Sequence, residues 1–326
     1  MTRSFSRLRA RLGLRRTARP GGTSRRAILL YHRIAAPAHD PFALAVQPTW
    51  FEDHLGILAT RSRLVGLAEM LAADPADPTV LTSITFDDGY ADNLAVAAPM
   101  LRAAGIPATY FVCTGALGDD RGFWWDRLAS AIAATDAPAA VLDGLDGIPP
   151  VGALTTEDDR TRATLAIAAR LQPLPPAARD QLLEEIETRL PPRAGASRAR
   201  CPILDEAGLR DLASQPLTEI GAHTEHHPML SRLTPEEQRD EIAGSIATIT
   251  DVTGTRPRFG AYPYGAQADY DDDSCRAAAD AGLRAAFVNH GGRFDPTGDP
   301  YRVPRTYVPP VAADGFRTWL DGILAR

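Results

Sequence analysis

The sequence predicts an α/β fold in which six or seven parallel strands form a closed or nearly closed (β/α) barrel. Two patterns predict it. Short apolar runs alternate with helical stretches, which is typical of βαβ units, and polar residues directly follow several of these runs. The composition agrees, because 44% apolar and 23% charged residues in a chain of 326 are typical of a globular protein. A doubly wound open sheet is the alternative, and in both folds ligands bind at the carboxyl ends of the strands.

The first part of the chain is expected to form three strands and one helix. Strands are indicated by short apolar runs, and the helix by its spacing and its terminal glycine. In chain order these elements are strand 27–34 (AILLYHRI), strand 83–88 (SITFDD), helix 93–105 (NLAVAAPMLRAAG) and strand 106–115 (IPATYFVCTG).

The same alternation recurs in the last third of the chain. One helix is expected to begin at Thr234-Pro235 with acidic residues in its first turn, as helix starts favour. In order, the expected elements are strand 217–223 (LTEIGAH), helix 234–254, strand 256–265 (RPRFGAYPYG), helix 270–282 (YDDDSCRAAADAG), strand 283–289, strand 301–308 (YRVPRTYV) and helix 312–326.

A helical insertion of about residues 136–200 is expected to interrupt this pattern. The segment is rich in Ala, Leu, Pro and acidic residues, and stretches 156–171 and 175–190 have amphipathic helical spacing. The segment contains two proline-rich hinges, GIPP (147–150) and PLPP (173–176). We therefore predict one α/β domain over residues 27–326 that carries the insertion.

The first 26 residues hold nine arginines and no acidic residue, and they predict a mobile basic tail. A solvated extension is the simple interpretation, and a weak contact with a membrane surface is the alternative. The net charge of −6 argues against a general nucleic-acid binder. No apolar run predicts a signal peptide or a transmembrane segment, which favours a cytoplasmic location. Three widely spaced cysteines predict neither a disulfide framework nor a cysteine zinc site.

Two polar clusters follow predicted strands. Asp87 and Asp88 precede Gly89, and three histidines, His223, His226 and His227, lie within five residues. Asp-Asp-Gly is also good turn chemistry, and paired histidines are often surface residues. At strand ends, however, two histidines four residues apart and one aspartate can hold a metal ion with open positions for water and substrate. The second aspartate would then be free to act as a general base.

Four motifs in order, YHRI, TFDDG, HTEHHP and AYPYG, make the chain similar to the polysaccharide deacetylase family (NodB homology, carbohydrate esterase family 4). The resemblance spans roughly residues 27–308 outside the insertion. It implies a distorted (β/α) barrel of the glycoside hydrolase/deacetylase type. It also implies a hydrolase that removes N- or O-acetyl groups from sugars with one divalent metal ion, most often zinc.

Carried over by position, the resemblance implies that Asp87 is the catalytic base and that Asp88, His223 and His227 bind the metal. Tyr264 would line the substrate groove, and its backbone N–H could face the developing oxyanion. The intervening His226 would lie outside the metal shell.

The chain departs from the family pattern at two places. Ala261 stands where the family has an arginine that holds the catalytic aspartate. Arg305 is the candidate replacement, with a surface ion pair as the alternative. The histidine that acts as the general acid is also displaced. His290 imitates the motif one strand too early, and His32, which would neighbour the last strand of a closed barrel, is slightly favoured.

Trp124 and Trp125 offer aromatic faces that can stack on sugars. Packing of the insertion is the expectation for one of them, and sugar contact, assigned to Trp125, is the hypothesis for the other. The sequence thus predicts a deacetylase acting on an N-acetylated sugar, or on a glycan precursor if the location is cytoplasmic. A glycan-binding pseudoenzyme and a hydrolase of a non-sugar amide are the alternatives.

Overall fold

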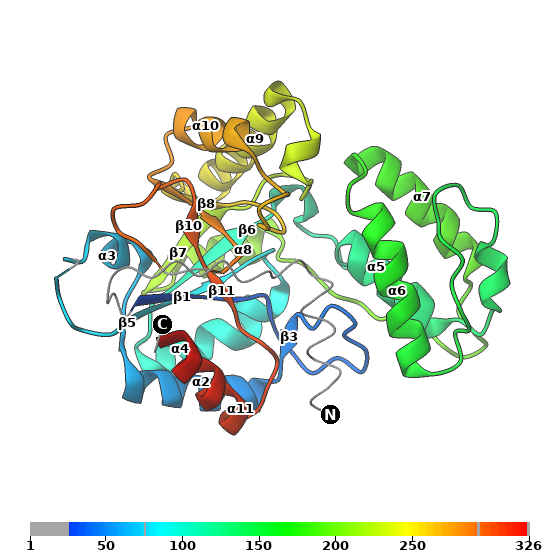
Figure 1. Ribbon diagram of the computed structural model, residues 1–326, viewed down its shortest axis with the longest axis horizontal. Helices are drawn as coiled ribbons and strands as arrows, with labels where there is room; N and C mark the ends of the chain where they lie inside the picture. Colours follow the sequence, from blue (N-terminus) through cyan, green and yellow to red (C-terminus); the bar gives the residue numbers. More distant parts are fainter. Residues whose placement is uncertain (1–25, 75, 292–293, 325–326) are drawn as a thin grey trace.

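A curved, all-parallel sheet forms the centre of the molecule (Figure 1). The computed structural model describes residues 26–74, 76–291 and 294–324. The predicted basic tail of residues 1–26 lies outside the described residues except for Arg26. The tail boundary was wrong at that residue, because Arg26 is the buried first residue of strand β1 and its guanidinium donates to the carbonyl of Ala73.

The sheet has nine strands, and its main path runs in the order β10-β9-β8-β7-β6-β5-β1-β11, with β4 paired to β5. Strands β2 (Arg33–Ile34) and β3 (Ala45–Val46) form a separate pair. The strands of the sheet are β1 (Arg26–Tyr31), β4 (Arg63–Leu64), β5 (Leu81–Phe86), β6 (Ala108–Val112), β7 (Thr218–Ala222), β8 (Phe259–Ala261), β9 (Ala285–Val288), β10 (Val303–Pro304) and β11 (Thr306–Tyr307).

The chain closes the barrel at Arg305. Strand β10 pairs with β9, and β11, which is separated from β10 by the single residue Arg305, pairs with β1. The single strand predicted over 301–308 is therefore two short strands, because the chain changes partner at Arg305. The N–H of Arg305 donates to the carbonyl of Val288 on β9, and the N–H of Val308 donates to the carbonyl of Leu30 on β1. The nearly closed barrel confirms the predicted fold class and excludes the open sheet.

Helices cover the outside of the barrel, as βαβ connections require. Thr234 caps α9, and Gly105 and Gly254, with φ of 67° and 71°, end α4 and α9 as predicted. Helices α2, α3 and α8 had not been predicted, and the helix predicted from residue 93 begins with a π-helical stretch, Asn93–Ala97. The helices are α2 (Pro48–Arg61), α3 (Leu67–Ala72), α4 (Ala98–Ala104), α8 (Glu206–Ser214), α9 (Pro235–Thr253), α10 (Asp272–Asp280) and α11 (Ala313–Leu324).

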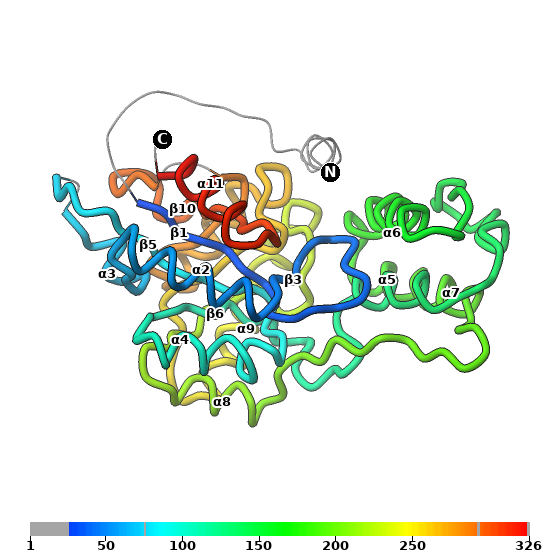
Figure 2. Tube along the Cα trace, turned by 90° about the horizontal axis from the view of Figure 1, so that it is seen from below, coloured from blue at the N-terminus to red at the C-terminus, as the bar shows by residue number. Residues whose placement is uncertain are grey.

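Three further helices form a lobe beside the barrel (Figure 2). They are α5 (Trp124–Ala134), α6 (Glu157–Leu171) and α7 (Pro176–Arg189). Helices α6 and α7 lie in the segment predicted as an insertion, and both pack on α5, which precedes it. Their apolar cluster includes Tyr90 and contacts Tyr264, two barrel residues that follow β5 and β8. The apolar core of the lobe thus extends to residues at the carboxyl ends of two barrel strands.

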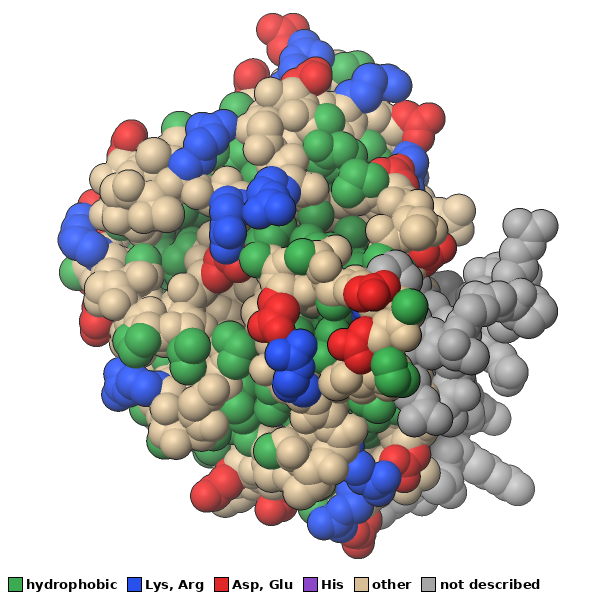
Figure 3. Space-filling model, turned by 90° about the vertical axis from the view of Figure 1, so that its left-hand side faces the viewer, with side chains coloured by type: hydrophobic (Ala, Val, Ile, Leu, Met, Phe, Trp, Pro, Cys, Tyr) green, Lys and Arg blue, Asp and Glu red, His purple; other side chains and the backbone are tan. Residues whose placement is uncertain are grey.

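The strands begin on the side away from the lobe, and Figure 3 shows that side. Acidic and basic side chains are interspersed there with apolar ones. The carboxyl ends of the strands point toward the lobe, so the polar residues that follow them gather between barrel and lobe (Figure 1). Among the described residues, none of the helices combines the length and the apolar character needed to span a bilayer.

Candidate active site

The two aspartates after β5 are buried, so the Asp-Asp-Gly turn is not a solvated one. Asp87 is 4% exposed and Asp88 is 1% exposed. Asp88 has a φ of 77°, a conformation that costs about 1–3 kcal/mol in a non-glycine residue and persists only where the surroundings enforce it. Gly89 follows at 86°, and a Cβ there would meet Val112 at 3.0 Å. Strained backbone of this kind is typical of functional sites.

Asp87 forms a bidentate ion pair with Arg305. The two Nη atoms lie 2.6 and 2.7 Å from the carboxylate oxygens, and Nη1 also donates to Thr85 at 3.2 Å. Both partners are buried, and the guanidinium lies 5.1 Å from the ring centroid of Phe111. The alternative of a surface ion pair for Arg305 was therefore wrong. Burial alone would raise the pKa of Asp87, but the charges of Arg305 and His223 outweigh it and keep the pKa below its usual value.

The histidine motif forms a tight buried loop after β7. His223 Nδ1 lies 2.8 Å from the carbonyl oxygen of Ala261, a contact in which the ring donates its N–H and leaves Nε2 free. Thr224 and His227 both have positive φ, 62° and 53°, and the N–H of His227 donates to the Thr224 hydroxyl at 3.2 Å. His226 points outward to Glu241, as predicted for a residue outside the metal shell.

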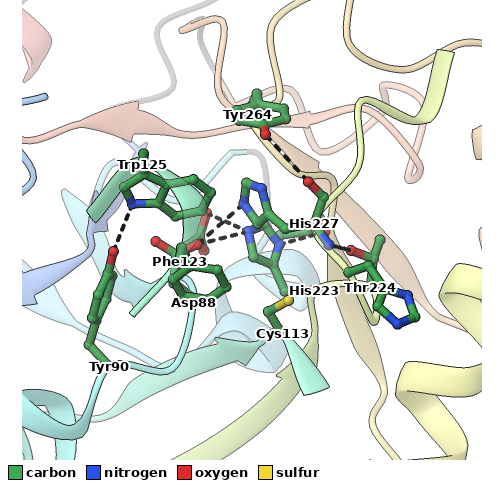
Figure 4. Close-up of polar contacts among 12 residues, drawn as sticks. Asp88, Tyr90, Cys113, Phe123, Trp125, His223, Thr224, His227 and Tyr264 are labelled. Atoms are coloured by element: carbon green, nitrogen blue, oxygen red, sulfur yellow. Dashed lines mark hydrogen bonds and ion pairs between the residues drawn. The ribbon is translucent and has the colours of Figure 1, made fainter. Parts of the chain in front are cut away.

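Asp88, His223 and His227 have the donor set and spacing of a metal site (Figure 4). One ligand atom from each lies within 4.8 Å of the others. Asp88 Oδ1 is 3.5 Å from His223 Nε2 and 3.3 Å from His227 Nε2. Within the described residues, both carboxylate oxygens of Asp88 and Nε2 of His223 are buried without a hydrogen-bond partner. Buried polar atoms without partners are rare, and a divalent ion held by two imidazoles and a carboxylate fits this gap.

The pKa of Asp88 supports the same interpretation. Burial would raise this pKa, but contacts from His223 and His227 outweigh burial and hold it well below the usual value. The carboxylate is therefore ionised and ready to bind a cation at neutral pH.

Aromatic side chains pack around the loop that follows β7 and carries His223 and His227 (the ligand loop). The Trp125 ring lies 4.5 Å from Phe123 and 4.7 Å from His227, between centroids, and its Nε1–H donates to Tyr90 at 2.8 Å. With 5% exposure, Trp125 has a packing role here, and contact with a sugar stays a prediction. Tyr264, half-buried and with a φ of 60°, donates to the carbonyl of His227 at 3.4 Å.

The two candidate acids lie in different places. His32 follows β1, and its ring centroid is 6.1 Å from that of Tyr307 on β11, the neighbour expected for a closed barrel. It lies close enough to both aspartates to be among the groups that lower the pKa of Asp87 and of Asp88. Its Nδ1 is buried and has no hydrogen-bond partner among the described residues. His290 Nε2 instead contacts the Tyr270 hydroxyl at 3.1 Å, so the geometry favours His32.

Sequence reasoning missed a buried carboxyl that supports the site from behind. Asp126 accepts hydrogen bonds from the Tyr90 hydroxyl at 2.8 Å and from the N–H of Phe123 at 3.0 Å. Tyr90 in turn holds Trp125 against His227 (Figure 4). Burial raises the pKa of Asp126 to about 7. Nothing in the sequence around Asp126 signals this contact, because its partner is 36 residues away.

The sequence profile of one family covers much of this architecture. The family model described as polysaccharide deacetylase matches residues 74–138 and 185–286, just over half of the chain. The chain belongs to the polysaccharide deacetylase family. The match includes both aspartates and both histidines of the deacetylase motifs, and it leaves out residues 139–184, which hold α6 and the first part of α7.

Solved structures support the same fold for this deacetylase family member. The Streptococcus pyogenes deacetylase PplD, solved in complex with acetate, is 17% identical with a TM-score of 0.57, over 90% of this chain and 96% of that one. IcaB from Ammonifex degensii is 17% identical with a TM-score of 0.57, over 92% and 97%. A de-N-acetylase from Aggregatibacter actinomycetemcomitans is 15% identical with a TM-score of 0.55, over 90% and 99%. No curated protein matches the chain in sequence.

Proposed function

We propose that the chain is a divalent-metal-dependent deacetylase that hydrolyses the N-acetyl group of an amino sugar in a saccharide. One observation carries the proposal. An ionised aspartate, Asp87, is held by Arg305 directly beside the site formed by Asp88, His223 and His227. His223 Nε2 lies 3.8 Å from Asp87 Oδ2, so a water molecule bound at the site would be within reach of the base.

The chain's own residues divide the work of amide hydrolysis. Asp87 takes the proton from the attacking water, since its low pKa keeps it ionised. His32 delivers a proton to the leaving amine. Asp88, His223 and His227 would hold the ion, for which this donor set favours Zn²⁺. When bound, the ion supplies Lewis acidity that acidifies water and polarises the acetyl carbonyl.

Tyr264 is proposed to border the saccharide. It is half-buried, and its hydroxyl contacts the ligand loop through the His227 carbonyl. Its backbone N–H is the proposed donor to the oxyanion that forms on the acetyl oxygen.

The main alternative is a saccharide-binding pseudoenzyme. The alanine at position 261 was the reason to consider it, because the arginine that holds the base is missing there. Arg305 makes that contact from another strand end, so the alternative loses its support. A binding protein has no need of an ionised base held beside a metal site.

The test is acetate release from N-acetylglucosamine oligosaccharides with added zinc or cobalt, with a chelator, and with Asp87→Asn. We expect release that needs the metal, and a loss of about 10²–10⁴-fold in Asp87→Asn. The matched control is Glu187→Gln, which neutralises another arginine-paired carboxylate inside the lobe. Saccharide binding without acetate release, from protein that holds stoichiometric metal, would support the pseudoenzyme instead.

A further inference from the structure

A buried arginine from the lobe reaches the loop that carries both histidines of the site. Arg179 of α7 is 4% exposed. Its Nη1 donates to the carbonyl of His227, and its Nη2 donates to that of His226, both at 3.3 Å. The guanidinium lies 5.6 Å from the Trp124 ring centroid, and its Nε contacts the half-exposed Asp180 at 3.4 Å. One side chain thus holds two consecutive carbonyls of the loop.

The opposite side of the loop is held by a carboxylate. Glu241 of α9 accepts hydrogen bonds from the N–H groups of Glu225 and His226, at 3.0 and 2.9 Å. Two carbonyls of the loop therefore face a cation, and two of its N–H groups face an anion. The segment between these two contacts carries His227 with a φ of 53°. A histidine keeps such a conformation only where several contacts enforce it.

Arg179 lies within residues 139–184, which the polysaccharide deacetylase model does not match. Other arginines near it bond to carbonyls of the lobe itself. Arg189, on the same helix, donates to Val141 and to Glu185, and Arg170 donates to Gly147. Arg179 instead reaches out of the lobe to the barrel loop. The lobe also touches this loop through Trp125, which packs on His227.

We propose that the helical lobe is a working part of the metal centre and that Arg179 is its positioning residue. By holding the two carbonyls, Arg179 fixes the left-handed turn that directs the His227 imidazole toward Asp88. The inference rests on the proposed function only in taking Asp88, His223 and His227 as metal ligands. It predicts that metal affinity depends on a residue that touches neither the metal nor the substrate, as groups that orient ligands do.

The test compares Arg179→Met with Arg189→Met in the full chain. Zn²⁺ affinity is measured by competition with a chromophoric chelator, and the melting temperature of the metal-free protein is measured in parallel. We expect Arg179→Met to weaken Zn²⁺ binding about 10–100-fold. Arg189→Met removes an arginine–carbonyl contact inside the lobe, so it should leave the affinity within about twofold of wild type. The visible spectrum of the Co²⁺ form should also change only in Arg179→Met.

Arg179→Lys keeps the charge but cannot span two carbonyls, and we expect an affinity between those of wild type and Arg179→Met. If Arg179→Met does not fold, Arg179→Lys decides the question. A Zn²⁺ affinity equal to that of wild type in the folded variants would overturn the inference. An equal loss in Arg189→Met would also overturn it, since the effect would then come from the stability of the lobe. Absence of Zn²⁺ binding in the wild type would instead refute the proposed function.

Discussion

Arg305 and Asp87 form a buried bidentate ion pair between positions 218 residues apart in the sequence. Arg305 is the single residue between β10 and β11, where the chain crosses from one side of the barrel seam to the other. The contact that holds the proposed base is therefore made by the segment that closes the barrel. The family's arginine position is Ala261, whose carbonyl accepts a hydrogen bond from His223. We infer that Arg305, at a different strand end, takes the role of the family's arginine.

Replacing Arg305 by Met should raise the pKa of Asp87, because the guanidinium is the main group that outweighs its burial. The base is active when ionised, so the acidic limb of the kcat/KM profile should move to higher pH. Turnover at neutral pH should fall by about 10²-fold or more. Breaking a buried pair also costs about 3–5 kcal/mol of stability. Arg305→Lys, which keeps the charge and loses the fork, should show a smaller shift.

Arg258→Met is the matched control for this prediction. At the surface, Nε and Nη2 of Arg258 both donate to Oε1 of Glu219, and exposed pairs contribute little. Its pH profile should overlay that of the wild type. An acidic limb that does not move in Arg305→Met or Arg305→Lys would show that the limb reports a group other than Asp87.

The sequence could predict those parts of the site that are local. Asp87 and Asp88 are adjacent, His223 and His227 are four residues apart, and both sets directly follow apolar strands that must run parallel. Arg305 could be proposed as an arginine in the last predicted strand, and His32 could be proposed because a closed barrel places the first strand beside the last. By contrast, Asp126 and Arg179 had no such signal. Each contacts the site through the fold of the lobe, where helical spacing reveals the packing face but not the distant partner.

Replacing His32 by Gln should lower kcat for an N-acetyl sugar by about 10²-fold, because the amine must be protonated to leave. His290→Gln is the control, and it should keep turnover within about twofold, since His290 contacts Tyr270 instead of the aspartates. An activated aryl acetate needs no proton for its leaving group. Turnover of such an ester should therefore survive in His32→Gln. Equal losses for amide and aryl ester would show that His32 does not act as the acid.

Metal loading should raise the melting temperature of the protein, because the ion binds three groups that are buried together only in the folded state. At a free Zn²⁺ concentration of about 100 times Kd, the free energy of unfolding should increase by about 2.7 kcal/mol. Asp88→Ala should abolish this gain. His226→Ala is the control from the same motif, and it should keep the gain, because His226 is exposed and lies outside the ligand set. A gain that persists in Asp88→Ala would place the ion elsewhere.

Asp126→Asn should have a greater free energy of unfolding, relative to wild type, at pH 8 than at pH 5. Burial raises the pKa of Asp126 from 3.8 to about 7. Between these values the folded state keeps a proton that the unfolded state releases, so wild-type stability falls as pH rises through this window. The total penalty well above pH 7 is on the order of 4 kcal/mol. An amide oxygen can still accept the hydrogen bonds from Tyr90 and Phe123.

The measurement is urea unfolding of both proteins at pH 5 and pH 8, with chelator present so that metal binding adds no pH dependence of its own. The stability of Asp126→Asn relative to wild type should be greater at pH 8 than at pH 5. The same difference at both values would mean that Asp126 is already ionised in the folded protein at pH 5.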